Sequence, residues 1–599
     1  MTAPRHLLPM LFAVGAGLAA LIMAPLLRPG HLLYRDAVST PRSHVTDTTL
    51  GIGDGAPRAV PQDWAIALLS GVIDGGAVVV AITFAALVFA GVGYGLLAHR
   101  LVGAAGRTGA VVAAVVAIWN PYVAERLLQG HWSLLVSYAA LSWVAVAAVT
   151  ILGGDGRSAG HSGFTRADRV PARDAARADG RWTRENGRWV PWAQLVAALG
   201  VAGFTPTGSV LSALLMVTLP GVGMILARRW LAVVLVWVAW LVAALPWLVA
   251  TAVGSAAVTS GSGGFTVFGV RAEPGLGTVG TVLGLGGIWN ADAVPASRTI
   301  WWAAVATALL LVVVVTGSVW LWRHRGRDTC AVTALAALAA VTAVAVSVAA
   351  IGPVAQMLSD AAAQLPGLGL FRDTQKFLAL MVPFVAVASA AAVAAARRWV
   401  PSGFALAAAI LLIVAPLPDL AWGVGGKIAP ITYPPDWAAV ATRISADHGA
   451  VAVWPTGTVR QYTFADVPSL DPLPRMVRAP VTGSGSLVVD SAVVDEASGR
   501  GAAVDTVLAD GGSARALADL GVGWVVVENG APPEALAREA EMVFDGADLL
   551  LYRVPGPIAD VDASTAARVA VIGTHVIWAM TTSIAVAVAL VGARRRTRR

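Results

Sequence analysis

Long apolar runs recur along almost the whole chain, and they constrain its fold more than any other feature. The runs "LLPMLFAVGAGLAALIM" near the start and "WLAVVLVWVAWLVAALPWLVATAV" in the middle contain no charged residue. A helix needs about 20 such residues to cross the hydrocarbon core of a bilayer. With 57% hydrophobic residues and only 13% charged ones, most of the chain must lie in lipid. The sequence therefore predicts a polytopic α-helical membrane protein.

About twelve membrane-spanning helices are expected from the apolar runs. Short basic clusters such as "LARRW", "RHRGRD" and the final "RRRTRR" separate many of them. If the N-terminus is cytoplasmic, nearly every basic cluster falls on the cytoplasmic side, as the positive-inside rule requires. This pattern accounts for the pI near 10 without a nucleic-acid partner. We predict a multi-pass plasma-membrane protein with both termini cytoplasmic and helices at 7–27, 77–98, 108–120, 133–152, 191–204, 208–226, 230–250, 300–322, 330–352, 376–396, 403–421 and 567–592.

This topology divides the chain into three parts. Residues 1–421 form a transmembrane core, 422–566 an extracytoplasmic domain, and 567–599 a final helix with a basic cytoplasmic tail. In the domain, β-branched runs such as "GAVAVWP" and "VGWVVVEN" alternate with stretches of helical spacing, which predicts an α/β fold. Cys330 is the only cysteine, so no intramolecular disulfide can form. The core would carry outer loops at 28–76, 251–298 and 353–375, and a polar, Arg-rich, disordered cytoplasmic loop at 153–190.

The first outer loop concentrates acidic, basic and histidine side chains just outside the first helix. A carboxylate in such a place suits a reaction in which an acceptor hydroxyl is deprotonated and a lipid phosphate leaves. The alternative is an ordinary solvated loop, and spacing alone favours that alternative. The residues concerned are His31, Arg35, Asp36, Arg42, His44, Asp47, Asp54 and Asp63.

A second polar group interrupts the apolar runs in "NPYVAERLLQGHWSLLVSY". If this segment is helical, Glu125 and Gln129 share a face and Arg126 lies beside them, with His131 just beyond. An unpaired charge at membrane depth costs about 2.5 to 3.5 kcal/mol, so such groups are paired or line a cavity. An interfacial hairpin with snorkelling side chains is an equal alternative.

The segment "FRDTQKF" places three charges before the tenth apolar run. If it continues that helix, Arg372 and Lys376 lie one turn apart and form a two-pronged anion site at a helix N-terminus. The alternative is that Asp373 neutralises both cations and anchors the helix at the interface. Positive charge on the outer side, against the general trend, favours phosphate binding.

Several kinds of catalysis lack sequence support. No P-loop, GxGxxG, HExxH, CxxC or GxSxG pattern occurs in a suitable context. Nucleotide hydrolysis, zinc chemistry and serine-hydrolase chemistry are therefore not indicated. The outer acids could hold a divalent cation, but no spacing specifies one.

Several segments, taken in order, resemble the large actinobacterial membrane arabinofuranosyltransferases of the GT-C class. They are "RPGHLLYRD", "NPYVAERLLQGHWSLLVSYAALSWV", "GFTPTGSVLSALLMVTLP", "FRDTQKF" and "YPPDWAAVATRI" followed by "VAVWPTGTVRQYTF". The likeness runs from about residue 28 to 470. It implies a GT-C-like core, a polyprenyl-phosphate sugar donor, no certain cofactor, and an extracytoplasmic active site that works on cell-wall glycans such as arabinogalactan or lipoarabinomannan.

The resemblance also suggests roles for single residues. The family's catalytic acid maps by position onto Asp36, with Asp47 as the alternative in the same loop. Arg372 and Lys376 match a family segment Arg-Asn-x-x-Lys-Phe, although Asp373 stands where Asn is expected. We therefore expect donor-phosphate binding by Arg372, Lys376, Arg126 and His131, and substrate contacts from Arg35, Glu125, Gln129 and Asp373. The aromatic Trp454 and Tyr462, with Trp437 as a further aromatic, are candidates for sugar stacking, although core packing is the more common role of such residues.

The predicted function is an inverting transfer of arabinofuranose, or of mannose, from a polyprenyl-phosphate donor to an envelope glycan or lipoglycan. The chain lacks the family's long carbohydrate-binding extensions, which leaves donor sugar and acceptor open. One rival is a non-catalytic scaffold or lipid-glycan binding protein of the same fold. Another is a polyprenyl-glycan flippase, which should carry polar residues deep within several helices, and few are present.

Overall fold

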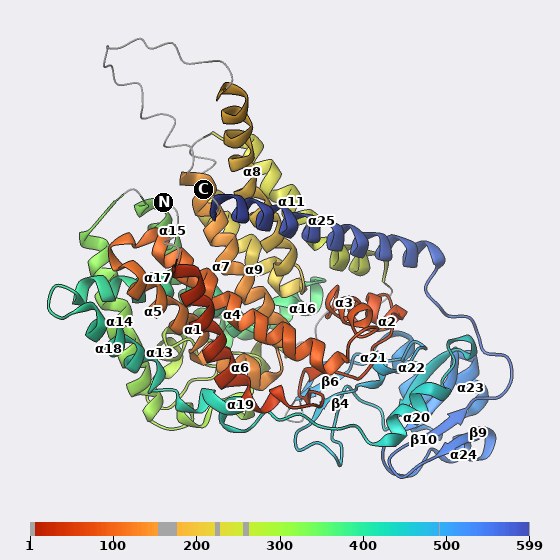
Figure 1. The fold of residues 1–599 in the computed structure, drawn as a ribbon. Helices are drawn as coiled ribbons and strands as arrows, with labels where there is room; N and C mark the ends of the chain where they lie inside the picture. Colours follow the sequence, from red (N-terminus) through yellow and green to blue (C-terminus); the bar gives the residue numbers. More distant parts are fainter. Residues whose placement is uncertain are drawn as a thin grey trace, which may run out of the picture.

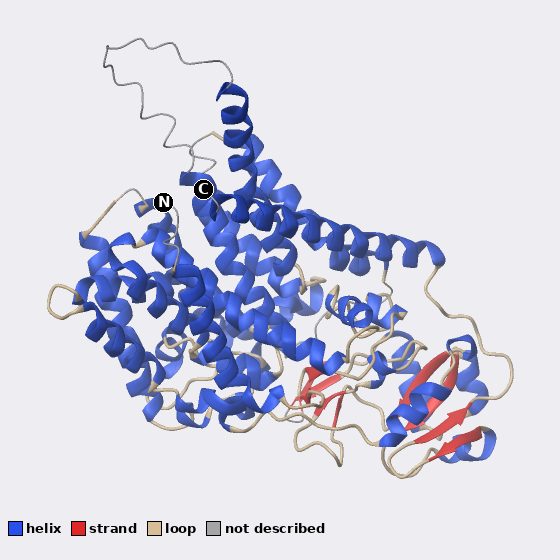
Figure 2. Cartoon of the chain, in the orientation of Figure 1, coloured by secondary structure: helices blue, strands red, loops and turns tan. Residues whose placement is uncertain are grey.

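Helices make up most of the protein, and strands gather in one region. The computed structural model describes residues 6–153, 176–221, 228–254, 263–326, 328–489 and 492–597. In Figures 1 and 2, α1 begins and α25 ends toward the top of the view, and the strands lie at the lower right. We call the part with the strands the α/β region, and the end of the helical bundle beside it the site end.

Eight helices of the described residues are long and apolar enough to cross a membrane, and two bent helix pairs raise the number to ten if each counts as one span. Two shorter apolar helices, Trp189–Ala202 and Pro206–Leu219, match the remaining two predicted segments. The prediction of a polytopic helical fold is confirmed. The main helices outside the strand-containing part are α1 (Leu7–Met23), α4 (Gly75–Leu101), α5 (Gly106–Ile118), α6 (Pro121–Gln129), α7 (Trp132–Gly153), α8 (Ala176–Ala202), α9 (Pro206–Met216), α11 (Trp230–Val253), α14 (Trp302–Arg323), α15 (Thr329–Ala349), α17 (Val382–Ala396), α18 (Ser402–Val414) and α25 (Thr565–Thr597). Helices α5 and α6 together make one of the eight spans.

The core of the bundle is built around α5, whose apolar residues are buried on all sides. Helix α4 packs against α1, α5 and α7, and α17 packs against α5 and α14. Helix α5 ends at Trp119, and α6 starts at once because the Asn120 side chain accepts a hydrogen bond from Val123 N and Pro121 occupies the first helical position. This break turns the polar helix α6 toward the site end.

The predicted loop 153–190 differs from the structure in its second half. The loop 153–190 was expected to be disordered. Residues 154–175 lie outside the described part, but 176–190 form the first half of α8. The segment 176–190 contains four Arg, a strong helix former, and it continues directly into an apolar helix.

The α/β region contains a four-stranded sheet in the order β3-β8-β10-β9, with β3 (Ala450–Trp454) parallel to β8 (Val522–Val527) and the other pairs antiparallel. The β-branched runs quoted above form β3 and β8, so the α/β prediction is confirmed. The other strands are β9 (Glu541–Asp545), β10 (Leu550–Arg553), and the short pairs β4 (Val459–Arg460) with β5 (Ser469–Leu470) and β6 (Leu487–Val489) with β7 (Ala492–Asp495). Around the sheet lie α20 (Pro435–Arg443), α21 (Leu473–Met476), α22 (Gly499–Ala509), α23 (Ala514–Asp519) and α24 (Glu534–Glu539).

The loop after α1 is tied to the C-terminal half of the chain. It contains the hairpin β1 (Leu33–Tyr34) and β2 (Ala37–Val38), and the helices α2 (Asp47–Leu50) and α3 (Gln62–Leu69). Leu33 and Val38 belong to the same hydrophobic core as Trp437 and Val451. The first loop and the α/β region therefore share one core, which places the hairpin β1–β2 between the bundle and the sheet.

Candidate active site

Asp36 stands at the tip of the hairpin β1–β2. Its neighbour Arg35 has φ 49°, a left-handed conformation that is costly for a side chain other than glycine. Backbone contacts stabilise this conformation, because Arg35 N donates to Pro468 O and Leu470 N donates to Arg35 O. The Arg35 guanidinium also donates to the Tyr34 hydroxyl and to Leu128 O. Arg35, which we expected to contact substrate, thus fixes the turn that presents Asp36.

The hairpin tip lies directly against the end of α6. Asp36 N donates to Gln129 O, 3.2 Å away. Gly130 ends α6 with φ +87°, and a Cβ at this position would lie 2.3 Å from Ala37 N and 2.9 Å from Asp36 N. Only glycine permits both this backbone conformation and this close approach. Gly130 therefore sets the distance between Asp36 and α6.

The Asp36 carboxylate is bound by two side chains that follow from this approach. His131 Nε2 lies 2.7 Å from Asp36 Oδ2, and Gln129 Nε2 donates to the same oxygen at 3.3 Å. The Asp36 side chain remains 38% exposed. Burial alone would raise the pKa of Asp36, but the hydrogen bonds from His131 and Gln129 and the charge of Arg58 outweigh it and lower the pKa below its ordinary value. Asp36 is an accessible, ionised carboxylate.

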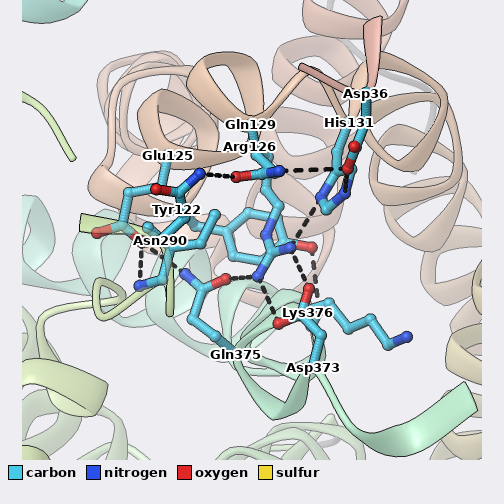
Figure 3. A network of polar contacts seen from close by, with 11 residues as sticks. Asp36, Tyr122, Glu125, Arg126, Gln129, His131, Asn290, Asp373, Gln375 and Lys376 are labelled. Atoms are coloured by element: carbon cyan, nitrogen blue, oxygen red, sulfur yellow. Dashed lines mark hydrogen bonds and ion pairs between the residues drawn. The ribbon is translucent and has the colours of Figure 1, made fainter. Parts of the chain in front are cut away.

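Arg126 lies behind His131 and is completely buried. Its guanidinium donates to Asp373 at 2.6 and 3.1 Å and also bonds Gln375 Oε1, and Nη1 lies 2.9 Å from His131 Nδ1. Burial would raise the pKa of Asp373, but the charge and hydrogen bonds of Arg126 hold it at about 2. Arg126 and His131 were expected to bind the donor phosphate; the structure commits their side chains to Asp373 and Asp36 instead (Figure 3).

Glu125 and Gln129 lie on α6 as predicted, and neither snorkels. Both are buried, so the interfacial alternative is wrong. Glu125 accepts hydrogen bonds from the backbone N–H groups of Gly287 and Ile288 and from Gln375 Nε2. Gln129 Oε1 accepts from Asn290 Nδ2, which orients its amide toward Asp36. These groups hold α6 against the loop after α13 (Gly277–Leu283).

The segment "FRDTQKF" does not continue the next helix. Arg372 follows the 3₁₀ turn η7 (Leu368–Phe371), Asp373 has the non-helical ψ 82°, and Lys376 lies in the 3₁₀ helix η8 (Thr374–Leu380). The prediction that Arg372 and Lys376 share an α-helical face is therefore wrong. The cause is Asp373, which forms its ion pair with the buried Arg126, although its charge also acts on Lys376.

Three cations nevertheless gather near one another, and the charge of one of them, Arg58, acts on Asp36. Arg372 Nη1 and Arg58 Nη2 both bind Asp495, at 2.6 and 2.9 Å, and the charges of both arginines act on Lys376. Among the described residues, Lys376 Nζ has no hydrogen-bond partner, and Figure 3 shows it pointing away from the buried network. Within the described part of the chain, Lys376 is thus the cation of the three whose hydrogen-bond donors are left for a ligand.

The remaining acids of the first loop are bound by arginines. Asp47, the alternative base, is 6% exposed and makes two 2.7 Å contacts with Arg568. Asp54 pairs with Arg500 and Asp63 with Arg475. Both oxygens of Asp47 are therefore used in an ion pair, and among the described residues no group of three or more His, Cys, Asp or Glu could hold the divalent cation left open above.

The three aromatic residues proposed for sugar contacts serve the α/β region's own packing. Trp437 is 1% and Tyr462 4% exposed, and both belong to its core. Tyr462 donates its hydroxyl to Glu528. Trp454 is half-buried at the end of β3 and donates to Ala531 O. Tyr462 and Trp437 cannot stack on a sugar without unfolding this core.

Sequence reasoning missed four members of the site. Gln375 and Asn290 hold Arg126 and Gln129, Tyr122 donates to Lys376 O, and Arg58 joins the cations through Asp495. Gln375 and Tyr122 stood inside the quoted segments, where polarity at membrane depth was a usable signal. Asn290 and Arg58 lie in outer loops, where the sequence offers no such signal.

The chain was compared with known proteins. No protein-family model matches it, and no curated protein does. Its structure does match that of the arabinofuranosyltransferase AftD from Mycobacteria, with 15% identity and a TM-score of 0.48 over 94% of this chain. It also matches ArnT from Cupriavidus metallidurans, bound to undecaprenyl phosphate, with 14% identity and a TM-score of 0.32 over 92% of this chain and 100% of ArnT.

AftD and ArnT are thus structural neighbours of the chain. This chain covers 42% of the AftD chain, less than half of its length. These identities and TM-scores describe a distant overall likeness. The chemistry of this protein therefore rests on the residues of its own site.

Proposed function

We propose that the protein is an inverting membrane glycosyltransferase that uses a polyprenyl-phosphate sugar as donor. One observation carries the proposal: Asp36 is an ionised, accessible carboxylate on which the charge of Arg58 acts, and Arg58 belongs to a cluster of three cations with Arg372 and Lys376. A base next to an anion site is what direct displacement of a phosphate by a hydroxyl needs.

The proposed reaction assigns one role to each group. Asp36 takes the proton of an acceptor hydroxyl, whose oxygen attacks C1 of the donor sugar. The bond between C1 and the phosphate oxygen breaks, and the electron pair leaves with the polyprenyl phosphate. Lys376 donates to the leaving phosphate, and Arg58 and Arg372 add positive potential, which stabilises charge that grows in the transition state. Direct attack inverts the configuration at C1.

The lipid-linked form of the donor is favoured by where Lys376 lies. Helices η8 and α17 form a bent pair that, taken together, is apolar enough to cross a membrane. Helix η8 also packs against the apolar helix α15. A phosphate bound by Lys376 would thus sit next to α15, most of whose residues are not buried in the protein, and a polyprenyl chain could remain in the bilayer while its headgroup reaches Asp36.

For the sugar and the acceptor we keep the proposal drawn from the sequence resemblance. Arabinofuranose is favoured as the donor sugar, with mannose as the alternative, and the acceptor is an envelope glycan or lipoglycan on the extracytoplasmic side. The α/β region, which shares a core with the hairpin that bears Asp36, is the part of the described chain best placed to orient an acceptor.

The test is sugar transfer by purified full-length protein in lipid, with synthetic polyprenyl-phosphate arabinofuranose and mannose as donors and short envelope glycans as acceptors. We expect one donor to be consumed with formation of a glycosidic bond of inverted configuration, and no product from Asp36→Asn. A protein that binds the donors equally in both forms and transfers neither would instead be a scaffold. Movement of intact lipid-linked glycan across sealed vesicles without transfer would make it a flippase.

A further inference from the structure

His131 lies between a guanidinium and a carboxylate. Its Nδ1 is 2.9 Å from Arg126 Nη1, and its Nε2 is 2.7 Å from Asp36 Oδ2. Figure 3 shows the four side chains in the order Asp373, Arg126, His131, Asp36. Each end of the imidazole therefore has a fixed partner.

The chemistry of these partners decides where the imidazole proton lies. A guanidinium nitrogen only donates hydrogen bonds, and an ionised carboxylate only accepts them. Nδ1 must therefore be the bare nitrogen that accepts from Arg126, and Nε2 must carry the hydrogen that is donated to Asp36. An imidazolium would place an N–H at Nδ1 directly against an N–H of Arg126.

Arg126 cannot turn aside to relieve such a conflict. Its side chain is 0% exposed, and the Asp373 carboxylate and Gln375 Oε1 hold the other N–H groups of Nη1 and Nη2. Asp373 also balances the guanidinium charge, so the buried pair leaves no net charge behind His131.

The same logic separates the two oxygens of Asp36. Both side-chain donors, His131 Nε2 and Gln129 Nε2, bind Oδ2. Among the described residues, no hydrogen bond reaches Oδ1, and the side chain is 38% exposed. Oδ1 is therefore the oxygen available to a substrate.

We propose that Asp373 and Arg126 hold His131 as the neutral Nε2–H tautomer, which makes His131 a positioning residue that aims Oδ1 of Asp36 at the acceptor hydroxyl. This inference rests on the proposed function for its catalytic meaning, but the tautomer does not depend on any substrate. The proton taken by Oδ1 stays on Asp36 until solvent removes it, because His131 has no free nitrogen to receive it.

The first test reads the tautomer directly. Full-length protein with ¹⁵N-labelled histidine is studied by solid-state NMR in lipid, and the His131 signals are assigned by their absence in His131→Gln. We expect Nδ1 to give the signal of a bare, hydrogen-bonded nitrogen and Nε2 that of a protonated one. A protonated Nδ1, in either the other tautomer or the imidazolium, would overturn the proposal.

The second test uses rescue by a side chain that can donate but cannot titrate. A Gln at position 131 can offer an N–H to Asp36, whereas His131→Leu cannot. We expect His131→Leu to lose roughly ten- to a hundredfold in transfer rate, the effect of one hydrogen bond to a charged group. His131→Gln should recover most of that loss and keep the wild-type pH profile. Equal loss in both variants, with folding retained, would make His131 a proton carrier and contradict the proposal.

A matched histidine provides the control. His31 Nε2 lies 3.0 Å from Asp74 in the same first loop, but no arginine binds its Nδ1. We expect His31→Gln to transfer at the wild-type rate. If wild type shows the Nε2–H tautomer but no transfer from any donor, the proposed function fails and the proposed tautomer stands. If wild type transfers sugar but Nδ1 of His131 is protonated, the proposed tautomer fails and the proposed function stands.

Discussion

Asp36 and Asp47 leave the same loop of the chain and have opposite surroundings. Asp47 is buried and bound at both oxygens by the guanidinium of Arg568, at the start of α25. Asp36 is half-exposed, and its side-chain partners are an imidazole and an amide, both on one oxygen. An arginine satisfies a carboxylate completely, whereas donors on one oxygen orient a carboxylate and leave the other oxygen reactive.

The difference extends to the rest of the loop. Asp54 and Asp63 are also paired with arginines of the C-terminal half. These pairs join the loop to the α/β region, so they add to the stability of the assembled site and not to its chemistry. Both oxygens of Asp47, Asp54 and Asp63 accept hydrogen bonds or ion pairs from arginines. Asp36 differs from them because its Oδ1 accepts no hydrogen bond within the described residues and is open to a substrate.

Gly130→Ala should abolish the close approach of Asp36 to the end of α6, and of these substitutions we expect it to lower the transfer rate most. A Cβ would displace Ala37 and Asp36 from the end of α6, and a shift of about 1 Å costs about a hundredfold in rate. Transfer rate and thermal inactivation are measured together. Gly103→Ala is the control, because a Cβ there meets nothing within 4 Å. A wild-type rate in Gly130→Ala would show that the close approach is not needed.

Lys376→Met tests whether the cluster of three cations acts on the donor. We expect kcat/KM for the lipid-linked donor to fall roughly ten- to a hundredfold, since one charged hydrogen bond to phosphate is lost. Stability should not fall, because Lys376 is 9% exposed and the substitution removes a buried charge. Lys427→Met, which loses a bond to Val294 O, is the matched control. Equal effects of both substitutions would argue against phosphate binding.

Asp47→Asn should weaken the protein without changing its chemistry. Arg568 keeps partial access to solvent and its contact with Asp562, so we expect a loss of about 1 kcal/mol and a lower inactivation temperature. Transfer at 25 °C should stay within about twofold of wild type. A folded Asp47→Asn protein that no longer transfers would make Asp47 the base.

The pH dependence of transfer provides the smallest expected change. The hydrogen bonds of Asp36 lower its pKa, so the carboxylate stays ionised down to below the ordinary aspartate value of about 4. Only when the pH falls through that lowered pKa is the base protonated, and the stability from its hydrogen bonds is lost there too. From pH 7.5 to 5 the rate should therefore vary within about twofold. A decrease with a midpoint near pH 6 would identify another titrating group as essential.

Hydropathy could predict the helical bundle because lipid allows few alternatives. A run such as that of α11 must become a buried or lipid-facing helix, whatever the rest of the chain does. The strands β3 and β8 were likewise visible as β-branched runs. The helix α6 and its shared face for Glu125 and Gln129 followed from local spacing.

The pairings of the site could not be predicted, because they join segments far apart in the sequence. The partner of Asp373 is Arg126, not the neighbouring Arg372 or Lys376, and this partner decides both the backbone of "FRDTQKF" and the role of His131. From local spacing alone, we predicted that "FRDTQKF" is α-helical and forms a phosphate site. The cost of leaving Arg126 buried without a counter-charge overrides that local preference.

The most direct test of the account compares Asp36→Asn and Asp47→Asn in donor binding and in single-turnover transfer. If Asp36 is the base, Asp36→Asn should bind the polyprenyl-phosphate donor with a Kd close to that of wild type and transfer at least about a hundredfold more slowly, while Asp47→Asn transfers normally. Transfer by Asp36→Asn at the wild-type rate, or loss of transfer only in Asp47→Asn, would contradict the account.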